Sequence, residues 1–242
     1  MLVIDHIKTR CLCNGMIDCL FQDATVEMIR SFQEVENIYV SAMREIITKL
    51  ENLNDELTIT INRSPIHQIK ARIKTPKSIA EKLIRRGFEL NIRSARENLN
   101  DIAGIRAICV YIDDIYNIAN LLTSQDDIRL LRRTDYIQNP KTNGYRSLHL
   151  VVTVPVFLSK RIESIKVEIQ LRTIAMDFWA SLEHDLVYKL ATDKTDDAVR
   201  ELKDCADIIT KTDLRMQKLH NMIDAAQKST PGERINKPFI MD

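Results

Sequence analysis

The first group of residues with spacing suited to phosphate chemistry runs from Arg72 to Arg85. If residues 66–74 form a strand, Arg72 and Lys74 share one face, because strand side chains alternate. On the helix expected to follow, Ser78, Lys82 and Arg85 fall at i, i+4 and i+7 and form one stripe. These four cations and one hydroxyl are suited to surrounding a triphosphate. A solvated basic face is the alternative interpretation.

The second group is Asp101, Gly104 and Arg106, at the start of an apolar run that predicts a buried strand from Gly104 to Ile112. A carboxylate beside a cationic pocket is a natural ligand for Mg²⁺ that bridges phosphates. The alternative is an aspartate in the turn before the strand.

The third group is the dense polar loop of residues 135–149, which contains Asn139-Pro140 and Asn143-Gly144 turn signals. Tyr145 offers a ring on which a base can stack. The other candidates in the loop, basic for phosphates or hydrogen-bonding for a base, are Lys141, Arg146, Asn143 and His149. A polar loop at a sheet edge is the alternative.

The fourth group lies on a strand predicted from Ser164 to Leu171. Glu168 and Gln170 fall on the polar side of its alternation, and a carboxylate there is costly unless it meets a metal, a base or a substrate hydroxyl. In the helix expected at residues 173–189, Trp179 reads as core. Glu183 and His184 read as structural hydrogen-bonding groups.

Composition describes an ordinary globular chain: 242 residues, 45% hydrophobic, 29% charged and a net charge of +1. The positive charge is concentrated in the middle, since residues 63–106 hold eleven basic and four acidic residues. That distribution suits a phosphate-rich ligand. We expect no membrane span and no secretory signal. The five cysteines then predict reduced thiols in the cytoplasm.

Periodicity predicts a mixed α/β sheet flanked by helices. Amphipathic helices are expected at 23–53, capped by Asp23, and at 196–226. Shorter helices are expected from Thr75-Pro76 to Gly87, at 94–98, and from an Asp113 or Asp114 cap to 122. Further strands are expected at 57–61, 127–134 and 146–154. The predicted division is a leader at 1–22, one domain at 23–190, and a helical extension with an irregular tail at 191–242.

These motifs together resemble the synthetase domain of RelA/SpoT-type alarmone synthetases, and in particular its small single-domain members. The resemblance runs from about Arg72 to Lys189. It is carried, in order, by the RIK…S…K…R run, DIAGIR, YIQNPKTNGYRSLH, and VEIQLRT followed by MDFWASLEH.

The resemblance implies a nucleotidyltransferase-like fold and transfer of pyrophosphate from ATP to the 3′-hydroxyl of GDP or GTP, giving AMP and (p)ppGpp. It implies Asp101 as a Mg²⁺ ligand, Glu168 as the base or second metal ligand, and Tyr145 as the ring that stacks on guanine. The ATP ligands that the resemblance implies are Arg72, Lys74, Ser78, Lys82, Arg85 and Arg106. Besides Tyr145, the implied GDP/GTP ligands are Lys141, Asn143, His149 and Gln170.

Partners and rivals follow from the same resemblance. The two long amphipathic helices need a surface to cover, so we expect a homo-oligomer, most simply a tetramer. No membrane or nucleic-acid partner is expected. One rival is a toxin-type relative that modifies the 3′ end of tRNA or makes adenosine alarmones. The other is a non-catalytic nucleotide sensor on the same fold.

Overall fold

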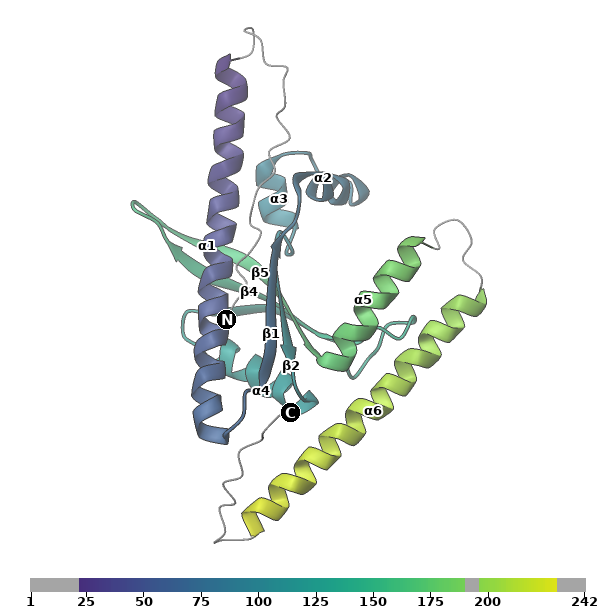
Figure 1. The fold of residues 1–242 in the computed structure, drawn as a ribbon. Helices are drawn as coiled ribbons and strands as arrows, with labels where there is room; N and C mark the ends of the chain where they lie inside the picture. The colour runs from purple at the N-terminus through teal and green to yellow at the C-terminus, as the bar shows by residue number, and fades with distance from the viewer. Residues whose placement is uncertain (1–21, 190–195, 230–242) are drawn as a thin grey trace, which may run out of the picture. The chain divides into compact units, whose positions relative to one another are not determined.

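The computed structural model describes residues 22–189 and 196–229. The chain comprises two compact units, residues 1–37 and 38–242. In the first unit the described residues, 22–37, are helical. The second contains the sheet and every side chain discussed below. Figure 1 labels the elements, which are, in chain order, α1 (Gln22–Ile61), β1 (Ile66–Ile73), α2 (Pro76–Arg85), α3 (Ile92–Asn98), β2 (Ala103–Cys109), α4 (Ile112–Thr123), β3 (Arg129–Asp135), β4 (Leu148–Phe157), β5 (Ile162–Thr173), α5 (Ile174–Lys189) and α6 (Asp196–Ser229).

The sheet has five strands in the order β1-β2-β5-β4-β3. The β2–β5 pair is parallel and the other three pairs are antiparallel. The expected mixed sheet is therefore confirmed, and β5 is its central strand. Helix α4 packs against β2, β4 and β5, and α6 runs alongside α5 (Figure 1).

One face of the sheet is apolar and forms the core. Ile105 on β2, Ile169 on β5 and Leu150 on β4 are opposite one another in the register and are almost fully buried. Burying a side chain of this size stabilises the fold by about 1.5–3 kcal/mol. Alternation then turns the residues between them to the other face, which is the face that carries the polar groups.

The expected strand at residues 57–61 is wrong, because α1 continues to Ile61. The hydroxyls of Thr58 and Thr60 donate to the carbonyls of Asn54 and Glu56, four residues earlier, which lets threonine sit within a helix. Asn62 then ends the helix with a φ of 55°, a left-handed conformation that asparagine tolerates.

Two predicted helix caps are also wrong. Helix α1 already includes Gln22, so Asp23 is a helical residue and not the N-cap. Helix α4 begins at Ile112 with Tyr111 as its N-cap. Asp114 lies three residues further on and accepts a hydrogen bond of 3.1 Å from the Tyr111 backbone N–H.

The predicted start of α2 is confirmed. Thr75 is its N-cap and accepts a hydrogen bond from the Ser78 backbone N–H at 3.3 Å, with Pro76 at the first helical position. Gly87 follows the helix with a φ of 72°. No helix of the described residues is long and apolar enough to span a bilayer. The tail predicted after residue 229 and the three cysteines of the leader lie outside the described residues, whereas Cys109 and Cys205 are free thiols.

Candidate active site

The polar face of the central strands carries two rows of residues that could contact a ligand. In the first row, Arg72 on β1 is opposite Gly104 on β2, which is opposite Glu168 on β5. In the second row, Arg106 on β2 is opposite Gln170 on β5, which is opposite His149 on β4. Residues that are opposite in the register share a face, so all four predicted groups contribute to one surface.

Asp101 lies just before β2 and receives two lysines. The ammonium groups of Lys74 and Lys82 both donate to Asp101 Oδ2, the latter at 2.6 Å. Burial alone would raise the pKa of this carboxyl, but the two lysine hydrogen bonds outweigh it and hold the pKa below its usual value. The other oxygen, Oδ1, is buried and has no hydrogen-bond partner. Asp101 is therefore an ionised group with one unsatisfied oxygen.

Local structure explains why Asp101 stands there. The side chain of Lys166 on β5 donates to the backbone carbonyls of Arg96 and Glu97 at the end of α3, at 3.3 and 2.7 Å. A cation at a helix C-terminus satisfies carbonyls that lack helical partners. This contact ties the end of α3 to the central strand, and the chain then leads directly to Asp101.

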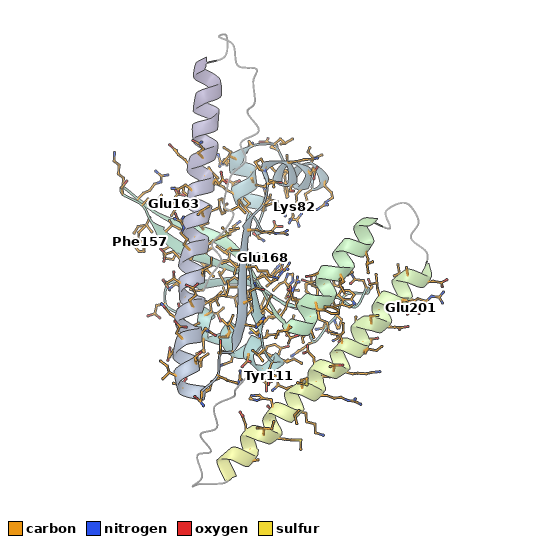
Figure 2. The ribbon with its side chains drawn as sticks, viewed as in Figure 1. Lys82, Tyr111, Phe157, Glu163, Glu168 and Glu201 are labelled. Atoms are coloured by element: carbon orange, nitrogen blue, oxygen red, sulfur yellow. The ribbon has the colours of Figure 1, made fainter. Side chains whose placement is uncertain are left out.

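Glu168 is the second carboxylate of this face. Its Oε2 accepts a hydrogen bond of 3.0 Å from Gln170 Nε2, and its Oε1 is 3.8 Å from His149 Nδ1. Burial would raise its pKa, but the interactions with His149 and Gln170 lower it below the usual value. The negative charge of Asp101 opposes that lowering, which indicates that the two carboxylates lie within electrostatic reach. In Figure 2, Lys82 projects from α2 and Glu168 lies on the sheet below it.

Three aromatic rings gather at the end of the loop before β4. The Tyr145 hydroxyl is 2.8 Å from His149 Nε2, and the rings of Tyr136, Tyr145 and His149 meet edge to face with centroids 5.1–5.9 Å apart. The ammonium group of Lys141 lies 4.6 Å from the centre of the Tyr145 ring and 4.8 Å from that of Tyr136. Such cation–π contacts fix the loop where a planar base could stack.

Helices α5 and α6 hold this loop in place. Asn143 donates to Glu183 on α5 at 3.1 Å, and it accepts from the Tyr145 backbone N–H at 3.2 Å. Gly144 has a φ of 91°, and a Cβ there would lie 2.6 Å from the Cβ of Ala206 on α6, so only glycine fits. The buried Trp179 and Ala206 form a small cluster against which Tyr145 packs. Trp179 thus belongs to the core, as expected.

The structure brings some predicted residues together and leaves others apart. Lys74 and Lys82 meet at Asp101. Tyr145 is hydrogen-bonded to His149 and Glu168 to Gln170, and the two pairs approach each other where His149 Nδ1 lies 3.8 Å from Glu168 Oε1. Within residues 22–189 and 196–229, Arg72 and Arg85 form no ion pair, and the Ser78 hydroxyl contacts Thr75.

Sequence reasoning missed three residues beside the site. Tyr136 belongs to the aromatic group and lies in the motif that was singled out. Arg172 and Asp177 are both buried, form an ion pair with each other and contact the second row, Arg172 at Gln170 and Asp177 at Arg106. The sequence did contain an indication of Arg172, because the strand alternation that places Glu168 and Gln170 on the polar face also places residue 172 there. It contained none of Asp177, since a carboxylate in the first turn of a helix is ordinary.

Comparison with known proteins identifies the family of the chain. Residues 71–193 match the family model described as a region found in RelA / SpoT proteins. The chain belongs to the RelA/SpoT family. Over 187 residues it is 44% identical to the GTP pyrophosphokinase YwaC of Bacillus subtilis (strain 168), a match that covers 77% of this chain and 89% of the relative. It is 33% identical over 189 residues to the GTP pyrophosphokinase YjbM of the same organism, which covers 78% and 88%.

Solved structures of the family have the same fold. The small alarmone synthetase 2 of Bacillus subtilis matches with a TM-score of 0.70 and 43% identity, over 76% of this chain and 96% of that one. The small alarmone synthetase 1 of Bacillus subtilis, solved bound to its product pppGpp, matches with a TM-score of 0.73 and 30% identity, over 80% and 98%. The family match begins at residue 71, near the end of β1, and extends past α5, so it includes both rows of the polar face.

Proposed function

We propose that this chain is a GTP pyrophosphokinase, which transfers pyrophosphate from ATP to the 3′-hydroxyl of GDP or GTP and releases AMP. The observation that carries the proposal is the pair of ionised carboxylates, Asp101 and Glu168, between a lysine-rich element and an aromatic loop on one sheet face. The relatives that cover most of the chain bear the same activity in their names.

In the proposed reaction, the donor binds on the side of β1 and α2. The 3′-oxygen of the acceptor attacks the β-phosphorus of ATP as the bond to the α-phosphate breaks, so AMP leaves with the bridging oxygen. Transfer of this kind depends on positioning and charge neutralisation. The groups assigned to the phosphates and adenosine of ATP are Arg72, Lys74, Ser78, Lys82, Arg85 and Arg106.

The acceptor lies against the loop before β4 in this proposal. Tyr145 stacks on the guanine. The exposed side chain of Lys141 lies over the Tyr145 ring in the structure, and it moves aside or binds phosphate when the base enters. His149, Gln170 and Asn143 donate or accept hydrogen bonds around the nucleoside. In the structure Asn143 also braces the loop through Glu183, so its substitution should affect loop order as well as binding.

The two carboxylates fit a magnesium ion held between protein and phosphates. Asp101 Oδ1 is buried and unsatisfied, and Mg²⁺ is bound in such sites by one or two carboxylates with substrate oxygens completing the shell. In the described part of the chain, no group of three or more His, Cys, Asp or Glu side chains could hold a metal ion by itself. Asp101 and Glu168 are the ligands we assign. The ion would neutralise charge on the phosphates.

Glu168 is also the group we assign as the proton acceptor. Its lowered pKa keeps it ionised at neutral pH, so it can take the proton from the 3′-hydroxyl as that oxygen attacks. The hydrogen bond from Gln170 at 3.0 Å fixes the rotamer of the carboxylate. General-base catalysis typically contributes roughly 10²–10⁴-fold, so Glu168→Gln should lose about that factor.

The test is product analysis with purified protein. Wild type and Glu168→Gln are incubated with ATP and Mg²⁺ and with GDP, GTP, ATP alone or tRNA, and the nucleotides are separated by chromatography. We expect AMP and a guanosine tetra- or pentaphosphate from the wild type only. Glu56→Gln, an exposed position on α1, is the matched control and should keep full activity. Products from tRNA or ATP alone would support the toxin-type reading, and guanosine nucleotide binding without AMP release would support the sensor.

A homo-oligomer, most simply a tetramer, belongs to the same proposal. Helices α5 and α6 expose large apolar side chains, including Phe178 at 59%, Met222 at 60% and Ile208 at 62%. Exposed apolar surface of this extent on two neighbouring helices favours association. Light scattering coupled to size exclusion gives the molar mass directly, and a monomer at micromolar concentration would refute this part of the proposal.

A further inference from the structure

Arg172, at the end of β5, is a buried arginine with partners on both sides of the polar face. Its side chain is only 4% exposed. One terminal nitrogen donates to the Tyr145 hydroxyl at 2.6 Å and to Gln170 Oε1 at 2.7 Å, and the other lies 3.3 Å from Asp177 Oδ1. Burial lowers the pKa of its guanidinium, although the contacts with Tyr145 and Asp177 favour the charged form. A group that is this costly to bury needs a reason beyond packing.

We propose that Arg172 is a positioning residue for the acceptor nucleotide, acting through Tyr145 and Gln170. This inference rests on the proposed function, because it takes Tyr145 as the ring that stacks on the base. A stacking ring must be held in one rotamer before the base arrives, or binding has to supply the ordering entropy. Arg172 supplies that constraint at the Tyr145 hydroxyl. Its contact with Gln170 orders the side chain that in turn orients Glu168.

Asp177, on the first turns of α5, keeps the arginine in place. Its side chain is 9% exposed, and its carboxylate also lies 3.1 Å from Arg106 on β2 and 3.4 Å from Lys70 on β1. Three cations from three strands therefore converge on one buried carboxylate. The planar guanidinium of Arg172 reaches Asp177 with one end and Tyr145 with the other, which a lysine ammonium cannot do.

The same arrangement indicates which substrate should bind more weakly when Arg172 is substituted. In Arg172→Met, Asp177 keeps Arg106 and Lys70, so no buried charge is stranded and the donor side retains its contacts. Tyr145 and Gln170 lose their donor instead. The acceptor should therefore bind more weakly, while ATP should not. A purely structural ion pair would reduce stability and weaken both ligands alike, or neither.

The experiment measures binding and turnover separately. Isothermal titration with GDP and, separately, with a non-hydrolysable ATP analogue is performed on wild type, Arg172→Met, Tyr145→Phe and the double variant. Arg129→Met, exposed on β3, is the control. Because Tyr145 and Gln170 lose hydrogen bonds from a charged donor, we expect the GDP Kd to rise about tenfold or more in Arg172→Met. The Kd for the ATP analogue should change less than about threefold, by the same reasoning on retained contacts.

The double variant tests whether Arg172 acts through the Tyr145 hydroxyl. If it does, the two single effects on the GDP Kd share one interaction, and the double variant is weakened by less than their product. Steady-state kinetics should show the acceptor KM rising more than the ATP KM. Equal losses for both ligands, an unchanged GDP Kd, or independent effects of the two substitutions would overturn the proposal.

If Arg172→Met does not fold, Tyr145→Phe still tests the proposal. This variant keeps the ring and removes only the atom that Arg172 and His149 hold. If Arg172→Met is not folded by circular dichroism, an unchanged GDP Kd in Tyr145→Phe refutes the inference. Failure of the proposed function gives a different result, since the wild type would then form no AMP from ATP and GDP whatever the variants bind.

Discussion

Gly104 provides a way to test where the ligand lies without disturbing the fold. It stands between Arg72 and Glu168 in the first row of the polar face. A Cβ added there has only the Arg72 carbonyl oxygen within 4 Å, at 3.8 Å, which is an ordinary contact. Because glycine in a strand costs about 0.5–1 kcal/mol relative to alanine, Gly104→Ala should leave the melting temperature unchanged or slightly raised.

The same methyl group points to the face on which the phosphates are proposed to lie. Gly104 and Glu168 are paired on neighbouring parallel strands, which lie about 4.8 Å apart, so the added group stands beside Glu168. Displacing a reacting group by about 1 Å can cost about 10²-fold in rate. We therefore expect Gly104→Ala to lose about tenfold and Gly104→Val about a hundredfold or more, measured as initial AMP release.

Gly87→Ala is the control variant, because it should change stability and not the reaction rate. Gly87 has a φ of 72° with no protein atom within 4 Å of an added Cβ, so alanine there is strained but has no steric clash. It should lower the melting temperature and keep the rate. If Gly104→Val is stable and fully active, the reaction does not take place over the centre of the sheet, and the assignment of Glu168 fails with it.

Two predictions concern stability. Burial raises the pKa of Asp213, so the folded state binds a proton more tightly than the unfolded state. The stabilisation from that proton is lost as the pH rises through the folded pKa. In a calorimetric pH series, Asp213→Asn should therefore have a higher melting temperature than wild type at pH 7 and the same melting temperature below about pH 4. Arg63 pairs with the buried Asp114 through two hydrogen bonds of 2.7–2.8 Å. Arg63→Met should cost about 2–4 kcal/mol in denaturant unfolding, whereas a loss below about 0.5 kcal/mol would mean that Asp114 finds another partner.

The motifs predicted local structure correctly where a local rule links spacing to direction. Alternation alone placed Glu168 and Gln170 on one face, and the structure confirms it through their hydrogen bond. Cap chemistry placed the start of α2 correctly because Thr75 and Pro76 act on their own neighbours. The strand expected at 57–61 failed for the converse reason. Alternation over five residues fits both periods, and threonine hydroxyls can bond within a helix.

The residues whose role could not be predicted from the sequence are those that have partners on several strands. Asp177 is an unremarkable residue in its own helix, and its importance arises only when Lys70, Arg106 and Arg172 converge on it from three strands. No local spacing encodes that convergence. It has a mechanistic consequence, because Arg106 on the proposed donor side and Arg172 on the proposed acceptor side share one carboxylate oxygen. In Arg172→Met that oxygen is left to Arg106, which is why the donor side is expected to keep its contacts in that variant.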